Sequence, residues 1–307
     1  MRSGRCSVVS GLIVILLGMM APVEVVIGGG EGETSNPGMR SEAGQREILE
    51  RINESPFPES IVLQSEEASD AIHGDLHGIV DAPFESLAAY LETTTHWCAI
   101  LFLHLNVKSC VQEGDGGEGM LDVYMGRRHY EKPEDADHVR FRFEVVEQDA
   151  GLIAVDMRSE EEARGTQEIR IQVQAAALDE ERSLVHMRYS VGIGRVGRTL
   201  LRVYLGTAGR DRVGFTVVRT DRAGDPVYVR AIRGMVERNT VRFYLALQAF
   251  VEYPEAEQLE QRFERWFELT DQHPEQLREV DRESYLDNKR REYENQRALQ
   301  EALRSGE

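Results

Sequence analysis

The chain has 307 residues, of which 41% are apolar, and a formal net charge of −18 at pH 7. This apolar fraction is enough to build a core, so the sequence is not that of a disordered protein, and the length suits one large domain or two small ones. The acidic charge argues against nucleic acid as a partner and against electrostatic adsorption to anionic lipid.

Residues 1–27 have the composition of a secretory signal peptide. Two arginines precede an apolar run from Leu12 to Met20, and Ala21 follows it. The run is short for a membrane span, and Glu24 beyond it disfavours the alternative of an N-terminal membrane anchor. We therefore expect an exported protein, periplasmic or extracellular.

Residues 28–70 are rich in Gly, Ser, Glu and Pro, with one weak helical patch near Ile48. This composition predicts a flexible leader. Regular structure is expected from residue 71, in a domain that covers 71–253. A helical extension over 254–307 is predicted to pack on that domain, and charged residues dominate it from 287.

The first predicted strand runs over 72–80. His73, Asp75 and His77 share its polar face, and three such residues at alternate positions can project metal ligands to one side. A solvated strand face gives the same pattern and is much commoner. We therefore predict no metal site.

A helix is expected to begin at Pro83, because proline suits the first helical turn. Its apolar face includes Phe84 and Leu91, at helical spacing. The segment from Trp97 to Val107 is apolar throughout, which predicts burial but does not distinguish helix from strand.

Cys98 and Cys110 are the cysteines that remain once residues 1–27 are removed. An even count suits a disulfide in an oxidising compartment, and two buried thiols are the alternative. His96, His104 and Cys98 could also serve as metal ligands or as a Cys/His nucleophile pair. No motif supplies a general base, so no catalytic residue is predicted.

Successive segments between Leu121 and Val191 alternate apolar and polar residues, as in 139–145, where valine and phenylalanine occupy the odd positions. This period of two predicts antiparallel strands joined by polar turns, with one dry face. A dry face has to be covered, and we expect helices after residue 240 to cover it.

Residues 192–197 match the G-x-G-x-x-G pattern of dinucleotide-binding loops. That site requires a preceding strand that is buried on both faces, whereas the segment 184–191 includes the polar His186 and Arg188 in alternation. We interpret these glycines as a bend at the sheet edge and predict no cofactor.

A helix over 237–247 starts polar and is then apolar on most sides, so it should be buried against the dry face. Arg238, Asn239 and Arg242 are at its entrance, where they could meet the polar head of a ligand. Capping of the helix and pairing with acidic neighbours are the alternative role.

A second amphipathic helix is expected over 259–269. The sequence from Asp287 onward is a charged helix with little to bury. We expect residues 287–307 to project into solvent or to bind a protein partner.

The segment 78–91, Gly-Ile-Val-Asp-Ala-Pro-Phe-Glu-Ser-Leu-Ala-Ala-Tyr-Leu, and then Trp97 carry a family resemblance. They are similar to the first strand, the Ala-Pro start of a helix and the following tryptophan of the helix-grip superfamily, which includes START lipid-transfer domains and polyketide-cyclase-like proteins. The resemblance covers 72–253. It implies an α+β fold in which a curved antiparallel sheet grips a C-terminal helix, and leaves open whether the helix over 240–253 or that over 259–269 is gripped.

The resemblance also implies a cavity for a sterol, a phospholipid or another apolar molecule. The expected function is an exported lipid-binding or lipid-transfer protein with transient membrane contact. The alternatives are an interaction or scaffold module with a filled core and, third, a cyclase-like or hydrolytic enzyme. Apolar spacing on the sheet and position on the helix assign nine residues to the cavity: Trp97, Phe141, Phe143, Ile171, Met187, Tyr189, Arg238, Asn239 and Arg242.

Overall fold

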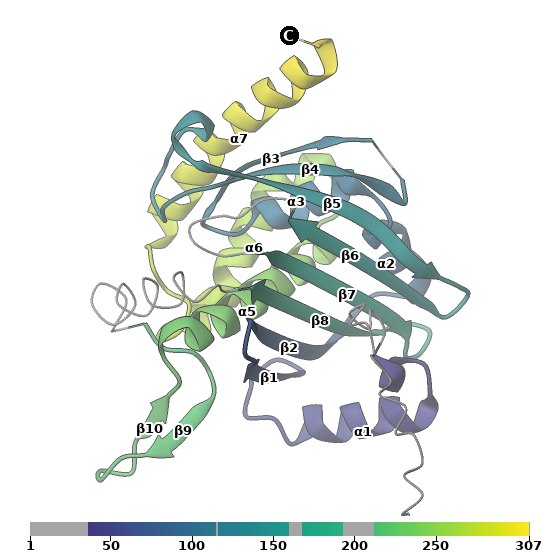
Figure 1. Ribbon diagram of the computed structural model, residues 1–307, viewed down its shortest axis with the longest axis vertical. Helices are drawn as coiled ribbons and strands as arrows, with labels where there is room; N and C mark the ends of the chain where they lie inside the picture. Colours follow the sequence, from purple (N-terminus) through teal and green to yellow (C-terminus); the bar gives the residue numbers. More distant parts are fainter. Residues whose placement is uncertain (1–35, 115, 160–167, 193–211, 307) are drawn as a thin grey trace, which may run out of the picture. The chain divides into compact units, whose positions relative to one another are not determined.

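The computed structural model describes residues 36–114, 116–159, 168–192 and 212–306. These residues belong to one compact unit over 34–307. Its centre is an eight-stranded antiparallel sheet that curves around a long helix (Figure 1). This is an α+β helix-grip architecture, so the fold class expected from the sequence is confirmed.

The sheet has the strand order β1-β2-β8-β7-β6-β5-β4-β3, so every pair of neighbours except β2 and β8 is consecutive in the chain. In spatial order the strands are β1 (Ile61–Glu67), β2 (Ala71–Val80), β8 (Ser183–Gly192), β7 (Ile169–Ala177), β6 (Leu152–Ser159), β5 (Asp137–Gln148), β4 (Glu118–Met125) and β3 (Val107–Glu113). A separate two-stranded sheet pairs β9 (Val217–Thr220) with β10 (Pro226–Tyr228).

Six α-helices are described. Three of them precede β3 in the chain, and the other three follow β10. They are α1 (Glu42–Asn53), α2 (Phe84–Leu91), α3 (Thr94–Phe102), α5 (Ala231–Glu252), α6 (Leu259–Asp271) and α7 (Arg282–Ser305). Short 3-10 helices cover Pro37–Met39, Pro133–Asp135 and Ala256–Gln258. Within the described residues, no helix is long and apolar enough to cross a membrane.

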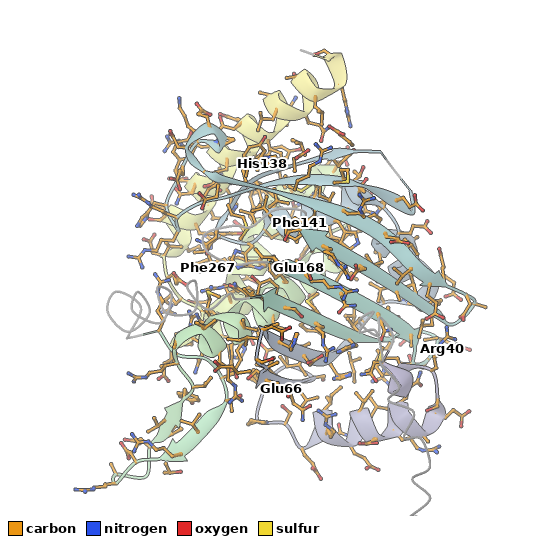
Figure 2. The ribbon with its side chains drawn as sticks, in the orientation of Figure 1. Arg40, Glu66, His138, Phe141, Glu168 and Phe267 are labelled. Carbon is orange, nitrogen blue, oxygen red and sulfur yellow. A yellow bond between two sulfur atoms is a disulfide. The ribbon has the colours of Figure 1, made fainter. Side chains whose placement is uncertain are left out.

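The dry face of the predicted strands is the inner face of the sheet. Phe141, labelled on β5 in Figure 2, is 3% exposed, and Phe143 two residues later is 1% exposed. Ile171 on β7 and Met187 on β8 are buried on the same side in one apolar core. Period two in the sequence therefore assigned these side chains to the correct face.

The gripped helix is α5, which packs against β1, β2 and β8. Glycines in β2 allow this close approach: a Cβ added at Gly78 would lie 2.3 Å from the hydroxyl of Tyr244, and one at Gly74 would lie 2.3 Å from Oγ1 of Thr240. The Tyr244 hydroxyl donates to the carbonyl of Ile79 at 2.9 Å. Of the two helices left open by the sequence, the one that includes 240–253 is gripped.

The prediction of a flexible leader over 28–70 is wrong from residue 36 onward, because this range contains α1 and edge strand β1. Ser41 caps α1 by accepting from the amide of Gly44. Ile48 and Ile52 of α1 are buried in a second apolar cluster with outer-face residues of β6, β7 and β8. That outer face has an apolar patch of its own, and α1 covers it.

Arg40, labelled in Figure 2 beside the β5–β6 hairpin, adds an ionic contact to this junction. It forms ion pairs with Glu147 and, at 3.0 Å, with Asp149. Both pairs are substantially exposed, so they contribute little to the stability of the fold.

The prediction that the helix from residue 287 has little to bury is wrong for one of its faces, because α7 packs along edge strand β3, whereas binding of a protein partner through residues 287–307 stays a prediction. Gln296 accepts from the amide of Cys110 at 2.8 Å, and Gln300 accepts from the amide of Gln112 at 3.0 Å. The glutamines thus satisfy edge amides that would otherwise be open to another chain.

Three buried charged residues, which we call the lysine cluster, fix α7 to β3: Lys108, Lys289 and Glu292. The ammonium of Lys108 lies 2.7 Å from Oε1 of Glu292, and that of Lys289 lies 2.9 Å from Oε2. Each ammonium also donates to a backbone carbonyl, of Leu105 and Val107 respectively. Deleting residues 287–307 would leave Lys108 buried without its carboxylate, so this segment is part of the fold.

Strand β9 begins at Val217, although the residues just before it, from Val213, are also largely apolar. The residues before it are held instead by the buried carboxylate of Glu237 on α5, which accepts from the amides of Phe215 at 2.6 Å and Thr216 at 2.9 Å. Because these amides bond a side chain, the segment does not join a sheet there.

Candidate functional site

A group of buried polar side chains lies around α5, where the helix meets Tyr189 of the sheet on one side and the segment 277–279 on another. We call it the grip cluster and define it as His104, Tyr189, Arg238, Asn239 and Arg242. His104 follows α3, Tyr189 is on β8, and the other three are on α5. All but Asn239 are at most 3% exposed.

His104 is the least satisfied member of the grip cluster. Its ring stacks on Phe243 with centroids 4.9 Å apart, and its Nδ1 accepts from the amide of Asn106 at 3.1 Å. The proton of the neutral ring is therefore on Nε2, which makes no hydrogen bond of normal geometry with a described residue, although the Asn239 side chain lies close to the ring. Burial, together with the positive charge of Arg242, holds the pKa of His104 well below its usual value, and the nearby Asn239 acts weakly in the opposite direction.

Tyr189 faces the same region from the sheet. Its hydroxyl lies 3.5 Å from Nδ2 of Asn239, at the limit of a hydrogen bond, and its ring is 5.7 Å from that of Phe243. Burial raises the pKa of Tyr189 to about 12, so the phenol is neutral at physiological pH. It can both donate to and accept from a bound group.

Arg238 and Arg242 are one helical turn apart on α5. Arg242 forms an ion pair with Glu279 at 2.7 Å and donates to the carbonyl of Leu277, while Arg238 donates to the carbonyl of Val213 at 3.0 Å. The Nε of each arginine is buried without a hydrogen-bond partner in the described structure. Burial and the charge of Arg242 lower the pKa of Arg238 to about 10.

The sequence expectation for these arginines is thus met in part. Arg242 does pair with an acidic neighbour, as the alternative role required. However, α5 begins at Ala231, so Arg238, Asn239 and Arg242 lie well inside the helix and not at its entrance. The earlier start could not be seen from the sequence because residues 231–236 mix polar, small and apolar types.

The apolar residues predicted to line a cavity are placed in the main core. Trp97 is fully buried on α3, and its indole donates to the carbonyl of Leu91 at 2.8 Å. The other members share the inner face of the sheet and are at most 3% exposed: Phe141, Phe143, Ile171 and Met187.

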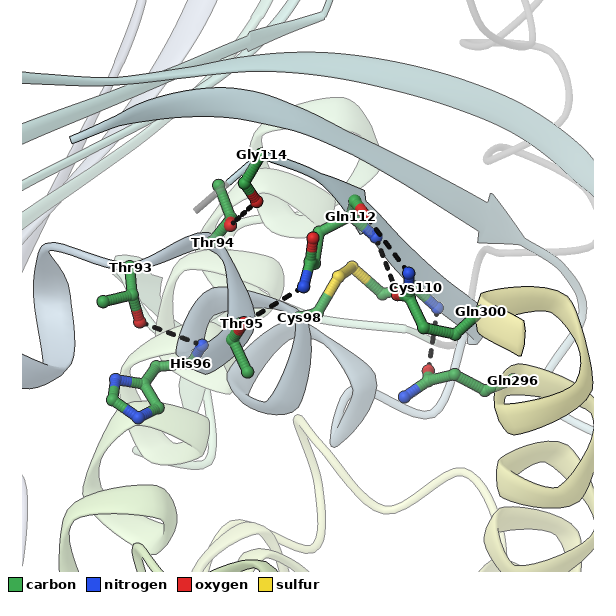
Figure 3. Close-up of a disulfide and its surroundings, with 10 residues drawn as sticks. All are labelled: Thr93, Thr94, Thr95, His96, Cys98, Cys110, Gln112, Gly114, Gln296 and Gln300. Atoms are coloured by element: carbon green, nitrogen blue, oxygen red, sulfur yellow. Dashed lines mark hydrogen bonds between the residues drawn. A yellow bond between two sulfur atoms is a disulfide. The ribbon is translucent and has the colours of Figure 1, made fainter. Parts of the chain in front are cut away.

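Cys98 on α3 and Cys110 on β3 form a disulfide in the structure (Figure 3). Cys98 therefore has no free thiol to act as a nucleophile. His96 is half-buried, and its Nδ1 donates to the carbonyl of Tyr90 at 3.2 Å, whereas His104 contacts Phe243. The two histidines of the enzyme hypothesis, His96 and His104, therefore contact different groups, and the third residue, Cys98, is in a disulfide.

The polar face of β2 is also satisfied by protein groups. Asp75 accepts from His186 at 2.9 Å and from Arg188 at 2.7 Å, and these bonds hold its pKa below the usual range despite its burial. His77 stacks on His186, and burial with the charge of that ring lowers the pKa of His77 to about 3. No group of three potential metal ligands occurs within the described residues. The G-x-G-x-x-G segment falls almost wholly outside those residues.

Sequence reasoning missed Glu279, which balances the arginines of the grip cluster, and all three members of the lysine cluster. The lysine cluster did leave one signal in the sequence: Lys108 is a single charged residue beside a segment predicted to be buried. Tyr285, Lys289 and Glu292 also recur at helical spacing on one face of α7.

No protein-family model matches the chain, and no curated protein matches it in sequence. It is similar in structure to the ZhuI aromatase/cyclase from Streptomyces sp. R1128, with a TM-score of 0.33 and 13% identity over 46% of this chain and 87% of that one. It is also similar to norcoclaurine synthase from Thalictrum flavum, with a TM-score of 0.32 and 12% identity over 48% and 82% of the two chains. For Ara h 8.0201 the TM-score is 0.34, with 10% identity over 59% and 98%.

Proposed function

We propose that this protein is an exported binding protein that holds one apolar small molecule, such as a lipid, with its polar end at the grip cluster. The observation that carries the proposal is a set of three buried N–H groups without a hydrogen-bond acceptor among the described residues: Nε2 of His104 and Nε of Arg238 and of Arg242. Buried donors are nearly always paired, and a ligand with oxygen atoms would supply acceptors for them.

The chemistry of these donors defines the polar end of the ligand. An N–H group needs an oxygen acceptor, which a hydroxyl, a carbonyl or a carboxylate can supply. Tyr189 adds a neutral hydroxyl that can bond the same group. The adjoining inner face of the sheet is apolar, so the remainder of the ligand should be apolar as well.

Export is supported by two features of the chain. Residues 1–27 have the order of a signal peptide, with arginines before a short apolar run. The Cys98–Cys110 disulfide suits an oxidising compartment. Fractionation of cells that produce the full chain should recover it outside the cytoplasm, with a mass reduced by cleavage near residue 27.

Native mass spectrometry of the purified full chain, followed by solvent extraction, tests the binding proposal. The expected result is a discrete added mass that extraction releases as an apolar molecule. The Tyr189→Phe and Asn239→Leu variants should retain less of it than wild type. A bare protein mass, together with no binding of sterol or phospholipid in titration, would contradict the proposal.

A second candidate is an interaction module with a filled core. It is favoured by the close burial of the inner face, where Met187 is fully buried and the indole of Trp97 is satisfied by protein. The same mass measurement separates the two candidates, because a filled core carries no extractable ligand.

A further inference from the structure

A groove lies outside the grip, on the other side of α3, and is built largely by the C-terminal helices. We call it the C-terminal groove. It has a volume of about 390 Å³, and its walls come from α3, β3, the end of α5, α6 and α7. The Cys98–Cys110 disulfide forms part of its floor, beside Gln296 and Gln300 of α7 (Figure 3). None of the grip-cluster residues lines it.

The floor of the C-terminal groove is mainly apolar. Phe102 and Ala99 contribute from α3, Phe250 from α5, Leu259 from α6 and Tyr293 from α7. The glutamines that bond β3 hold α7 at a fixed distance from α3, so the groove is a built feature of the fold. Its volume falls in the range of small-molecule sites.

Arg262 is a buried cation in this groove that makes no ion pair with a described residue, although Glu255 is near enough for its charge to act on it. It is 4% exposed, and its guanidinium lies 5.2 Å above the ring of Phe250. One nitrogen donates to the carbonyl of Pro254 at 3.1 Å, but Nε has no partner and no ion pair with a described residue is formed. Buried charges are normally paired, so this arginine is prepared for an anion that the chain does not supply.

Two further arginines extend the positive charge along the groove. Arg297 and Arg304 are seven positions apart on α7, which places them on one face, and neither is paired with a described acidic residue. Glu255 is the one acidic side chain in the lining. In a chain with a formal charge of −18, this local excess of cations favours an anionic ligand.

We propose that the C-terminal groove binds a free long-chain fatty acid. The carboxylate pairs with the guanidinium of Arg262, and the single hydrocarbon chain lies over Phe102, Phe250 and Leu259. One chain suits a groove of about 390 Å³ better than the two chains of a phospholipid. This site is independent of the grip cluster and does not rest on the function proposed for it.

Calorimetric titration of the full chain with dodecanoate and with dodecanol tests the proposal, since the two probes differ only in the charged head. Dodecanoate should bind at least about tenfold more tightly, as expected when a charged hydrogen bond is gained. Arg262→Met should remove that preference. Arg265→Met is the matched control, because Arg265 lies on the same helix but is paired with Glu252, and it should bind as wild type does.

A second variant tests the same site in case Arg262→Met does not fold. Arg297→Glu with Arg304→Glu changes only exposed residues, and it should weaken dodecanoate binding several-fold while leaving dodecanol binding unchanged. Tyr189→Phe should leave both titrations unchanged, which separates this site from the grip cluster. Equal affinity for the two probes, or unaltered dodecanoate binding in the Arg297→Glu, Arg304→Glu variant, would overturn the proposal.

Discussion

The lysine cluster and the grip cluster both bury charged side chains, but their charges are balanced differently. In the lysine cluster each oxygen of Glu292 lies within 2.9 Å of an ammonium, Oε2 in an ion pair without hydrogen-bond geometry, and each lysine also bonds a carbonyl. In the grip cluster three N–H groups have neither an acceptor nor a counter-ion of their own among the described residues. A closed cluster holds two elements together, whereas an open one leaves hydrogen-bonding capacity for a ligand.

The largest expected effect comes from opening the closed cluster. Glu292→Gln keeps the side-chain shape but leaves Lys108 and Lys289 buried without a counter-charge. We expect a loss of about 3 to 5 kcal/mol in the free energy of unfolding, measured with urea at pH 7. The control Glu294→Gln, at an exposed position of the same helix, should change it by less than about 0.5 kcal/mol. A loss under about 1 kcal/mol in Glu292→Gln would show that the lysine cluster does not hold α7.

A second expected effect is a rise in stability at alkaline pH. Burial lowers the pKa of Lys289 to about 8, from about 10.5 in the unfolded chain, although Glu292 opposes the shift. Between these values the unfolded chain binds more protons than the folded one, so the free energy of unfolding should increase with pH, by at most about 1.4 kcal/mol per pH unit.

Urea unfolding of wild type and Lys289→Met between pH 8 and 10 measures this rise, which should be smaller in the variant, where only Lys108, whose pKa burial also lowers, still contributes. The rise should end near pH 10. Burial raises the pKa values of Tyr244 and Tyr285, so above pH 10 these tyrosines make the free energy of unfolding decrease as the pH increases. A wild-type stability that falls steadily from pH 8 would be inconsistent with a depressed lysine pKa.

The smallest expected effect compares two buried tyrosines. Tyr244 donates to a carbonyl at 2.9 Å, whereas Tyr189 has only a 3.5 Å contact with Asn239. Tyr244→Phe should lower the free energy of unfolding by about 1 to 3 kcal/mol, and Tyr189→Phe by less than about 1 kcal/mol in ligand-free protein. Equal losses would mean that the Tyr189 hydroxyl is already satisfied by the fold.

The sequence predicted the inner face of the sheet well because one local rule decides it. Alternate residues of a strand share a face, so Phe141, Phe143 and Met187 could be assigned without knowledge of their neighbours. The helix start at Pro83 followed from an equally local preference.

The polar parts of the structure could not be predicted in the same way. The carboxylate that neutralises Lys108 is 184 positions away in the sequence, and no local pattern joins the two residues. The face that α7 buries includes the charged residues Lys289 and Glu292. A prediction based on the number of apolar residues therefore took this helix to be exposed. Arg238, Asn239 and Arg242 could be named from the sequence because they are close together in it, but their contacts involve His104, Glu279 and Val213 from three other segments.

The most direct test of the open grip cluster is the imidazole ¹⁵N–¹H spectrum of the full chain before and after solvent extraction. If a ligand oxygen accepts from His104, extraction should shift the Nε2–H resonance of His104 and leave that of His138, paired with Asp122 on the outer face, unchanged. Identical His104 resonances in the two samples would contradict a ligand at this cluster.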